Sequence, residues 1–216
     1  MRAAAELVEP GMRLGLGSGR AVWAVVDALA AAGVRPQVVV CAGDATARLA
    51  ARAGLAVAAP EAAPALDLAL DGADEITRDL AVLKGGGGAL LREKLVFASA
   101  QRCVIVAETP KLVARLGERW RLPVEVVRFG WPGTRLRLLG LLGDAVLRSA
   151  ADGSPLVTDE GHHILDCALP ESGDLAALGD AVKAVTGVVE HGLFLTQAHT
   201  ALLGAPDGTL ERLVRP

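Results

Sequence analysis

Short runs of aliphatic and β-branched residues alternate with longer Ala- and Leu-rich segments up to about residue 120. This alternation is typical of a parallel β-sheet covered by helices, because parallel strands are joined by helical crossovers. We predict strands at residues 12–16, 37–42, 66–70, 80–83 and 103–107. We predict helices at residues 22–32, 45–53 and 89–100, each bounded by glycine or a turn.

The pattern of elements changes after Leu122. A strand with the sequence VEVV is followed by a helix that begins near Pro132, and then by two strands joined at residues 159–161. A helix at residues 174–185 and a strand at residues 188–195 complete the series. The order β-α-β-β-α-β is that of a small ferredoxin-like domain.

These two patterns predict an α/β fold with two domains. We expect a Rossmann-like, mostly parallel sheet flanked by helices, and a smaller ferredoxin-like α+β domain. The last residues, 200–216, are expected to return to the first domain. The catalytic α/β domain then comprises residues 1–122 plus 200–216, and the small domain, a candidate oligomer contact, comprises residues 123–199.

Composition excludes several classes of function. The chain of 216 residues has 22 Lys and Arg against 25 Asp and Glu, a net charge of -3 that gives no general attraction to nucleic acid or an anionic membrane. Aromatic residues make up 3% and Tyr is absent, so base-stacking platforms are not expected. No apolar stretch reaches the roughly 20 residues needed to cross a bilayer. Glu6 and Glu9 interrupt any signal-like start, so we predict a cytoplasmic protein.

Cysteine and histidine show no metal-binding pattern. The three cysteines form no C-x-x-C pair, and the four histidines lack metal-like spacing to a nearby carboxylate. We therefore expect no metal and interpret these residues as structural or solvent-exposed.

Four segments that follow predicted strands are the candidate ligand-binding positions, because ligands gather outside the carboxyl ends of parallel strands. They are residues 15–20, 71–75, 84–88 and 108–111. The first, GLGSGR, joins a strand to a helix through three glycines, whose N–H groups can approach a phosphate at the helix N-terminus. It is neither a dinucleotide fingerprint nor a P-loop. A tight turn without a ligand explains the same glycines equally well.

The second segment, DGADE, places Asp71 and Asp74 three residues apart in a turn. Two neighbouring carboxylates can take different roles. One stays ionised and orients hydroxyls, while the pKa of the other is raised so that it can act as an acid. An Asx turn with solvated charges is the simpler explanation of an isolated D-x-x-D.

In the third segment, four consecutive glycines follow Lys84. Each glycine costs up to about 1 kcal/mol of chain entropy relative to alanine, and close approach of the backbone to a ligand would justify the run. Lys84 can neutralise an oxyanion, and Glu93 on the next helix can reach the same crevice as a base. We interpret Arg92 and Lys94 as exposed helical charges. Lys111 can complete a cationic pocket, although a surface lysine is the default interpretation.

The motifs GLGSG, LDGADEI, LKGGGGALLREKLV, LPVEVV and GVVEHGLF occur in this order along nearly the whole chain. Together they resemble ribose-5-phosphate isomerases of the A type, and DGADE followed by KGGG and REK is the specific part of the match. The resemblance implies interconversion of D-ribose 5-phosphate and D-ribulose 5-phosphate through a cis-enediol(ate), in the non-oxidative pentose phosphate pathway. It also implies no cofactor and a homodimer or homotetramer.

The resemblance assigns a role to each candidate. Glu93 would move the proton between C2 and C1, and Lys84 would stabilise the charge on oxygen. Asp71 and Asp74 would bind sugar oxygens and assist ring opening, and which of them opens the ring stays undecided. The implied substrate-binding residues are Gly17, Ser18, Gly19, Arg20, Gly72, Ala73, Gly85, Gly86, Gly87 and Lys111.

The first glycine loop departs from the family pattern Gly-Thr-Gly-Ser-Thr. Ser18 keeps the first hydroxyl, whereas Arg20 and Ala21 replace the next two. Arg20 either makes a charge-assisted contact to the phosphate in place of these hydroxyls or points into solvent, and we favour the contact.

Two other functions are compatible with the predicted sheet. One is a non-catalytic sugar-phosphate sensor, which the presence of Glu93 and Lys84 disfavours. The other is a different enzyme on a similar fold, such as an amino-sugar-phosphate deaminase or a coenzyme A transferase. Fold alone does not separate these enzymes.

Overall fold

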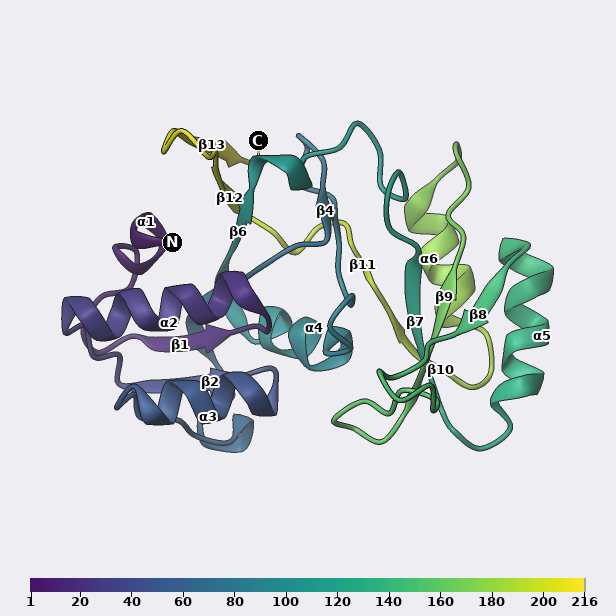
Figure 1. The fold of residues 1–216 in the computed structure, drawn as a ribbon, viewed down its shortest axis with the longest axis horizontal. Coiled ribbons are helices and arrows are strands. Elements are labelled where there is room, and N and C mark those ends of the chain that lie inside the picture. The colour runs from purple at the N-terminus through teal and green to yellow at the C-terminus, as the bar shows by residue number, and fades with distance from the viewer. Residues whose placement is uncertain (216) are drawn as a thin grey trace.

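A six-stranded sheet forms the centre of the computed structural model, which describes residues 1–215 (Figure 1). Its order is β13-β12-β6-β3-β1-β2. The strands are β1 (Arg13–Leu16), β2 (Val38–Cys41), β3 (Leu66–Asp71), β6 (Ala100–Glu108), β12 (Thr200–Gly204) and β13 (Leu210–Val214). All neighbours are parallel except β12 and β13, which are antiparallel. The mostly parallel sheet predicted from the sequence is confirmed, and β12 returns the end of the chain to it.

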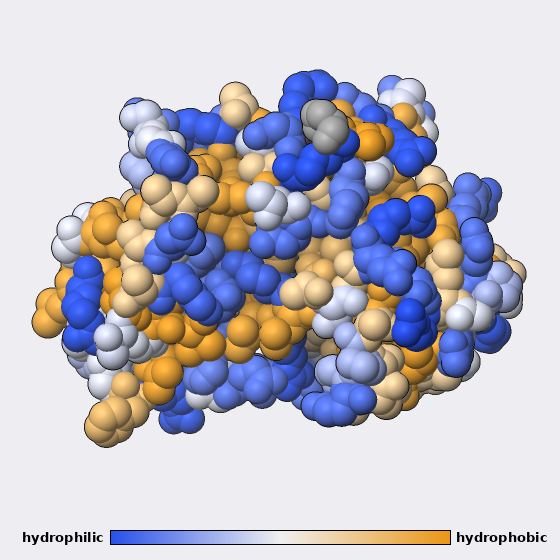
Figure 2. Space-filling model, turned by 180° about the vertical axis from the view of Figure 1, so that it is seen from behind, coloured by the Kyte–Doolittle hydropathy of each residue, from blue (hydrophilic) through white to orange (hydrophobic). Residues whose placement is uncertain are grey.

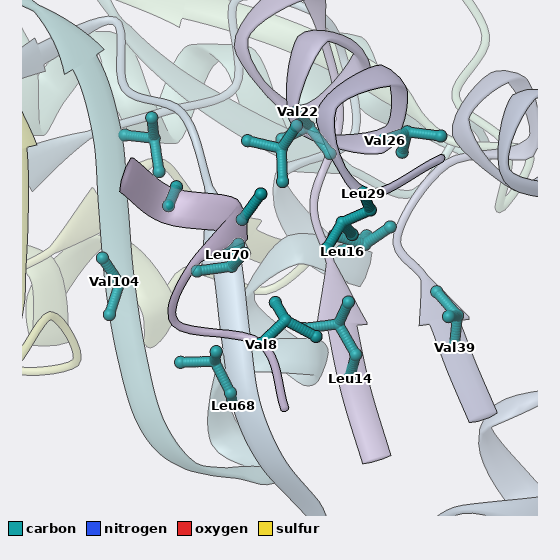
Figure 3. Packing of buried hydrophobic residues seen from close by; sticks show 14 of the residues in the cluster. Val8, Leu14, Leu16, Val22, Val26, Leu29, Val39, Leu68, Leu70 and Val104 are labelled. Atoms are coloured by element: carbon teal, nitrogen blue, oxygen red, sulfur yellow. The ribbon is translucent and has the colours of Figure 1, made fainter. Parts of the chain in front are cut away.

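Helices cover both faces of this sheet. They are α1 (Arg2–Ala5), α2 (Arg20–Ala32), α3 (Asp44–Arg52) and α4 (Leu90–Ala98), with single turns η1 (Pro60–Ala62) and η2 (Thr109–Lys111). Because side chains alternate along a strand, Val104 of β6 packs with α1 and α2, whereas Ile105 packs with α4. Figure 3 shows the first of these layers, with Leu68 and Leu70 of β3 among its members. None of the helices among residues 1–215 is long and apolar enough to cross a bilayer.

The connections around β1 create a crevice at one edge of the sheet. The chain leaves β1 through α2 to β2 on one side, and α3 then leads back to β3 on the other side of β1. Such a switch point opens a ligand crevice outside the carboxyl ends of the two inner strands. Leu16 is paired with Leu70, so the segments after β1 and β3 leave the sheet at the same level.

A second sheet has the order β10-β7-β9-β8, and all its pairs are antiparallel. Its strands are β7 (Leu122–Val126), β8 (Ala145–Leu147), β9 (His163–Cys167) and β10 (Val188–His191), with helices α5 (Trp131–Leu142) and α6 (Leu175–Lys183). Apolar residues of both helices pack on this sheet. The element order β-α-β-β-α-β predicted for this part of the chain is confirmed.

A small three-stranded sheet differs from the prediction. The segment predicted as a strand at residues 80–83 forms only β5 (Val82–Leu83), which pairs antiparallel with β4 (Glu75–Ile76) and β11 (Leu193–Phe194). The strand predicted at residues 188–195 is interrupted at Gly192. A Cβ there would lie 2.1 Å from the Lys84 carbonyl oxygen, so the close approach of two backbones requires glycine. In Figure 1, β4 and β11 lie between the two larger sheets.

Candidate active site

A cavity of about 470 Å³ opens at the crevice. Residues from the segments after β1, β3, β5 and β6 line it, together with Glu93 of α4. The predicted site residues on its wall are Ser18, Gly19, Arg20, Gly72, Ala73, Asp74, Lys84, Gly85, Gly86, Gly87, Glu93 and Lys111. Four segments far apart in the sequence therefore meet in one space.

Lys84 lies at the centre of the charged wall. Its ammonium nitrogen is 3.0 Å from Oδ2 of Asp71 and 3.3 Å from Oε2 of Glu93, and it donates a hydrogen bond of 2.8 Å to the Gly72 carbonyl. The side chain is 3% exposed. Its backbone N–H donates to the Gly192 carbonyl, so the three-stranded sheet fixes its position. The ammonium therefore faces three oxygens before any ligand arrives.

Asp71 and Gly17 lie beneath the cavity rather than on its wall. Oδ1 of Asp71 accepts hydrogen bonds from the N–H groups of Gly72 (2.7 Å) and Ser18 (3.2 Å), and the residue is fully buried. A Cβ at Gly17 would lie 1.8 Å from Cγ of Asp71, so only glycine fits there. The resemblance implies that both residues take part in substrate binding; in the structure Asp71 contacts Lys84 and the Ser18 N–H, and Gly17 packs against Asp71.

The glycine run after Lys84 approaches Asp74 closely. The Gly86 N–H donates a hydrogen bond of 2.7 Å to Oδ2 of Asp74, and a Cβ at Gly86 would lie 2.7 Å from Oδ1. Gly85 has a φ of +105°, a conformation that favours glycine. Gly85 is thus favoured by the backbone path, and Gly86 by the carboxylate against which it packs.

Glu93 occupies the first turn of α4 and is 5% exposed. Burial raises its pKa to about 8, the negative charge of Asp71 adds to the increase, and Lys84 opposes it. Burial also raises the pKa of Asp71 against the opposing effect of Lys84. Burial alone would lower the pKa of Lys84, but Asp71 and Glu93 outweigh it and the pKa is raised. A buried carboxyl with a pKa of about 8 can act as a proton donor or acceptor near neutral pH.

The opposite end of the cavity is more open. Arg20, the first residue of α2, is exposed at the helix N-terminus, where N–H groups and the helix dipole favour an anion. Lys111 lies with its ammonium 5.2 Å from the centre of the Trp120 ring. Both residues line the cavity and bring two positive charges to it, with the Glu108 carboxylate also on its wall.

Comparison with known proteins identifies the family. The model of the family "Ribose 5-phosphate isomerase A (phosphoriboisomerase A)" matches residues 38–208. The chain is 49% identical over 212 residues to ribose-5-phosphate isomerase A of Roseiflexus castenholzii (strain DSM 13941 / HLO8), covering 96% of this chain and 91% of that protein. The chain belongs to the ribose 5-phosphate isomerase A family.

Other members of the ribose 5-phosphate isomerase A family agree in sequence and fold. Ribose-5-phosphate isomerase A of Synechococcus sp. (strain JA-3-3Ab) is 46% identical over 211 residues, covering 96% of this chain and 92% of that protein. The solved structure of ribose 5-phosphate isomerase from Plasmodium falciparum has a TM-score of 0.92 at 31% identity, covering 99% of this chain and 94% of that chain. The likeness extends over both larger sheets.

Glu75 is a residue of this isomerase to which the sequence assigns no role. Its buried carboxylate accepts hydrogen bonds from the N–H groups of Gly117 (2.6 Å), Arg119 (2.6 Å) and Trp120 (2.9 Å). It thus shapes the loop that carries Trp120 against Lys111. The only signal in the sequence is a third carboxylate in DGADE.

The interpretation of Lys94 and Arg92 as exposed charges is wrong. The Lys94 ammonium donates to the carbonyls of His191 (2.7 Å) and Leu193 (2.9 Å) and pairs with Glu190 at 3.0 Å. Arg92 pairs with carboxylates of α3 and of the segment before β9. These partners are distant in sequence, so helical spacing alone gave no sign of them.

Of the remaining titratable side chains, Glu108 also lines the cavity. The four histidines do not line the cavity. Within residues 1–215, no group of three or more His, Cys, Asp or Glu side chains is arranged to hold a metal ion.

Proposed function

We propose that the cavity binds an open-chain pentose 5-phosphate and that Glu93 transfers its proton. As a member of its family, the chain is an aldose-ketose isomerase that interconverts ribose 5-phosphate and ribulose 5-phosphate. The observation that carries the residue assignment is the Glu93 carboxylate, 3.3 Å from the Lys84 ammonium on the wall of a cavity of about 470 Å³.

Glu93 acts as the single base and acid of the reaction. Its carboxylate takes the proton from C2 of the aldose, the C2 electrons form the C1–C2 double bond, and the C1 carbonyl oxygen becomes the enediolate oxygen. The enediolate then passes the O2 proton to O1, and Glu93 returns its proton to C1 to give the ketose. A pKa of about 8 makes both transfers feasible near neutral pH.

Lys84 stabilises the charge that develops on oxygen. The protonated Glu93 loses its negative charge, so the Lys84 ammonium is released to pair with the enediolate oxygen. Asp71 lies behind Lys84, 3.0 Å from its ammonium, and acts as a positioning residue. Asp74, which faces the cavity and holds the Gly86 N–H, is the carboxylate that assists ring opening.

The open end binds the phosphate. The N-terminus of α2 offers N–H groups, and Ser18 adds a hydroxyl. Arg20 and Lys111 supply positive charge, with Arg20 in the place of the hydroxyls usual in the family.

The test is incubation of the pure protein with ribose 5-phosphate in heavy water, with a chelator and no added cofactor. We expect ketose to form and deuterium to appear at the carbon that receives the proton. Glu93→Gln is expected to bind substrate without turnover. Ketose formation at a normal rate by Glu93→Gln would remove Glu93 from the mechanism.

We further propose that the protein is a homodimer or homotetramer. Phe129 is 95% exposed, Leu136 67% and Val146 50%, and all three belong to the second sheet, its helix or their connection. Figure 2 shows that orange apolar side chains also reach the surface among blue charged ones on the reverse face. Light scattering of the wild type and of Phe129→Ser tests this, and a monomeric wild type would refute it.

The domain division and location are also proposals. We propose one domain of residues 1–122 plus 200–216 and one of residues 123–199, a division supported by the return of β12 to the first sheet. We propose a cytoplasmic location, and cell fractionation with an antibody to the protein would test it.

A further inference from the structure

Arg148 connects the second sheet to the glycine run of the cavity. It follows β8, and its Nη1 donates a hydrogen bond of 2.6 Å to the Gly85 carbonyl and one of 3.2 Å to the Gly86 carbonyl. Its side chain is 14% exposed and does not line the cavity. The guanidinium therefore touches the back of the loop whose other side faces the substrate space.

Asp166 of β9 holds this guanidinium in a fixed orientation. Oδ2 of Asp166 accepts from Nε of Arg148 at 2.8 Å, and Oδ1 accepts from Nη2. A two-point pair of this kind fixes the plane of the arginine as well as its position. Nη1 is thereby directed at the glycine carbonyls.

One peptide unit joins Arg148 to Asp74. The Gly85 carbonyl and the Gly86 N–H belong to the same peptide group, so Arg148 binds its oxygen while Asp74 binds its N–H. A cation on the oxygen polarises the group and strengthens the hydrogen bond at the N–H. The next peptide group accepts a longer hydrogen bond from Arg148 at the Gly86 carbonyl, and Gly87, whose N–H belongs to that group, lines the cavity.

We propose that Arg148, fixed by Asp166, is a positioning residue for the isomerase reaction. It orders a run of glycines that would otherwise be highly mobile, and it sets both Asp74 and the Gly87 N–H toward the substrate. This inference rests on the proposed function of the cavity. It also gives the second sheet a role in turnover, although no residue of that sheet lines the cavity.

The test compares Arg148→Met, Arg148→Lys and Arg121→Met. Arg121 is the matched control because it pairs with Asp144 and donates to the Asp166 carbonyl, in the same sheet, without touching the glycine run. We expect Arg148→Met to lower kcat about 10- to 100-fold, since misplacement by about 1 Å can cost that much. KM for ribose 5-phosphate should change less than about threefold, because the phosphate end is untouched. Arg148→Lys should recover part of kcat, and Arg121→Met should keep it.

Two results would overturn the inference: an unchanged kcat in Arg148→Met, or equal losses of kcat in Arg148→Met and Arg121→Met. If Arg148→Met does not fold, Asp166→Asn serves in its place, with a reduced kcat expected and an unchanged one contradicting the proposal. Glu93→Gln in the same assay separates the two questions. Full turnover by that variant would refute the proposed role of Glu93, whatever Arg148 does.

Discussion

The two ends of the cavity are built in opposite ways. At the reactive end, Asp71, Lys84 and Glu93 are nearly inaccessible to solvent and already paired with one another. At the open end, where we propose that the phosphate binds, Arg20 is exposed, and Lys111 packs against a tryptophan rather than a carboxylate. The reactive end is rigid and demands specific residues, whereas the open end is held by weaker and replaceable contacts.

This contrast is consistent with the departure from the family pattern that we noted in the first glycine loop. The replaced hydroxyls lie in the first glycine loop at the open end, where a charged side chain can do the same work. At the reactive end, any change leaves a buried charge without its partner, which is far more costly. Substitutions at the reactive end should therefore lower kcat or the free energy of unfolding strongly, whereas substitutions at the open end should have smaller effects, mainly on KM.

The largest effect is expected from Glu93→Gln, which keeps the shape of the side chain and removes the base. We expect kcat to fall about a thousandfold or more, since general base catalysis contributes up to about 10⁴-fold. Steady-state assays would measure kcat. The control is Glu61→Gln, the same substitution at an exposed glutamate in η1. Retention of more than a tenth of kcat would contradict the assignment.

The next effect is expected from Lys84→Met, which leaves Asp71 and Glu93 buried without a cation. Breaking a buried ion pair in this way costs about 3–5 kcal/mol of the free energy of unfolding. Urea denaturation would measure the loss. The exposed Lys183, which pairs with Glu190, is the control, and Lys183→Met should cost less than about 1 kcal/mol. If Lys84→Met and Lys183→Met lost equal amounts of the free energy of unfolding, the buried ion pairs would be no more important for stability than the exposed one.

A smaller effect is expected from Arg20→Ala at the open end. Because the phosphate is bound equally in the ground and transition states, KM should rise about threefold to tenfold while kcat stays near the wild-type value. Arg35→Ala, which removes an exposed arginine away from the cavity, should leave both constants unchanged. An unchanged KM in Arg20→Ala would show that the Arg20 side chain does not contact the phosphate and points into solvent.

The smallest effect is a pH-dependent change in stability. The pKa of Glu93 is about 8 in the folded protein and near 4.5 when the side chain is free, so wild-type stability declines as pH rises between these values. Gln does not titrate, so the stability of Glu93→Gln lacks this pH dependence. The difference in Tm between Glu93→Gln and the wild type should therefore grow in favour of the variant from about pH 5 to about pH 8.5. We expect the growth to correspond to about 1 kcal/mol or more of the free energy of unfolding. A pH-independent difference would show that Glu93 does not keep a raised pKa.

Much of the reactive end could be predicted from the sequence because its residues follow strands in recognisable motifs. Asp74 follows β3 of the parallel sheet, as the rule for ligand positions predicts, whereas Lys84 follows β5 of the antiparallel three-stranded sheet and Glu93 lies on α4. Burial was harder to predict: Asp71 carries the same motif signal as Asp74 but lies behind the wall. Hydrophobic periodicity does not say which of two carboxylates in a turn faces the ligand.

Contacts between distant segments could not be predicted. Arg148 and Gly85 are 63 positions apart, and nothing in the sequence near Arg148 distinguishes it from a surface arginine. The predicted strands at residues 80–83 and 188–195 contain β5 and β11, but β4 is only two residues long, too short for alternation to reveal it, and the pairing of these three strands in a separate sheet was not foreseen. Such features depend on how the sheets pack, which follows from the whole chain.

The tryptophan beneath Lys111 gives this molecule an optical reporter at the mouth of its cavity. Indole emission responds to a nearby charge, and the Lys111 ammonium lies 5.2 Å from the Trp120 ring centre. A phosphate that binds near that ammonium should alter the emission of Trp120. Ligand binding could then be followed by intrinsic tryptophan fluorescence, without an attached dye.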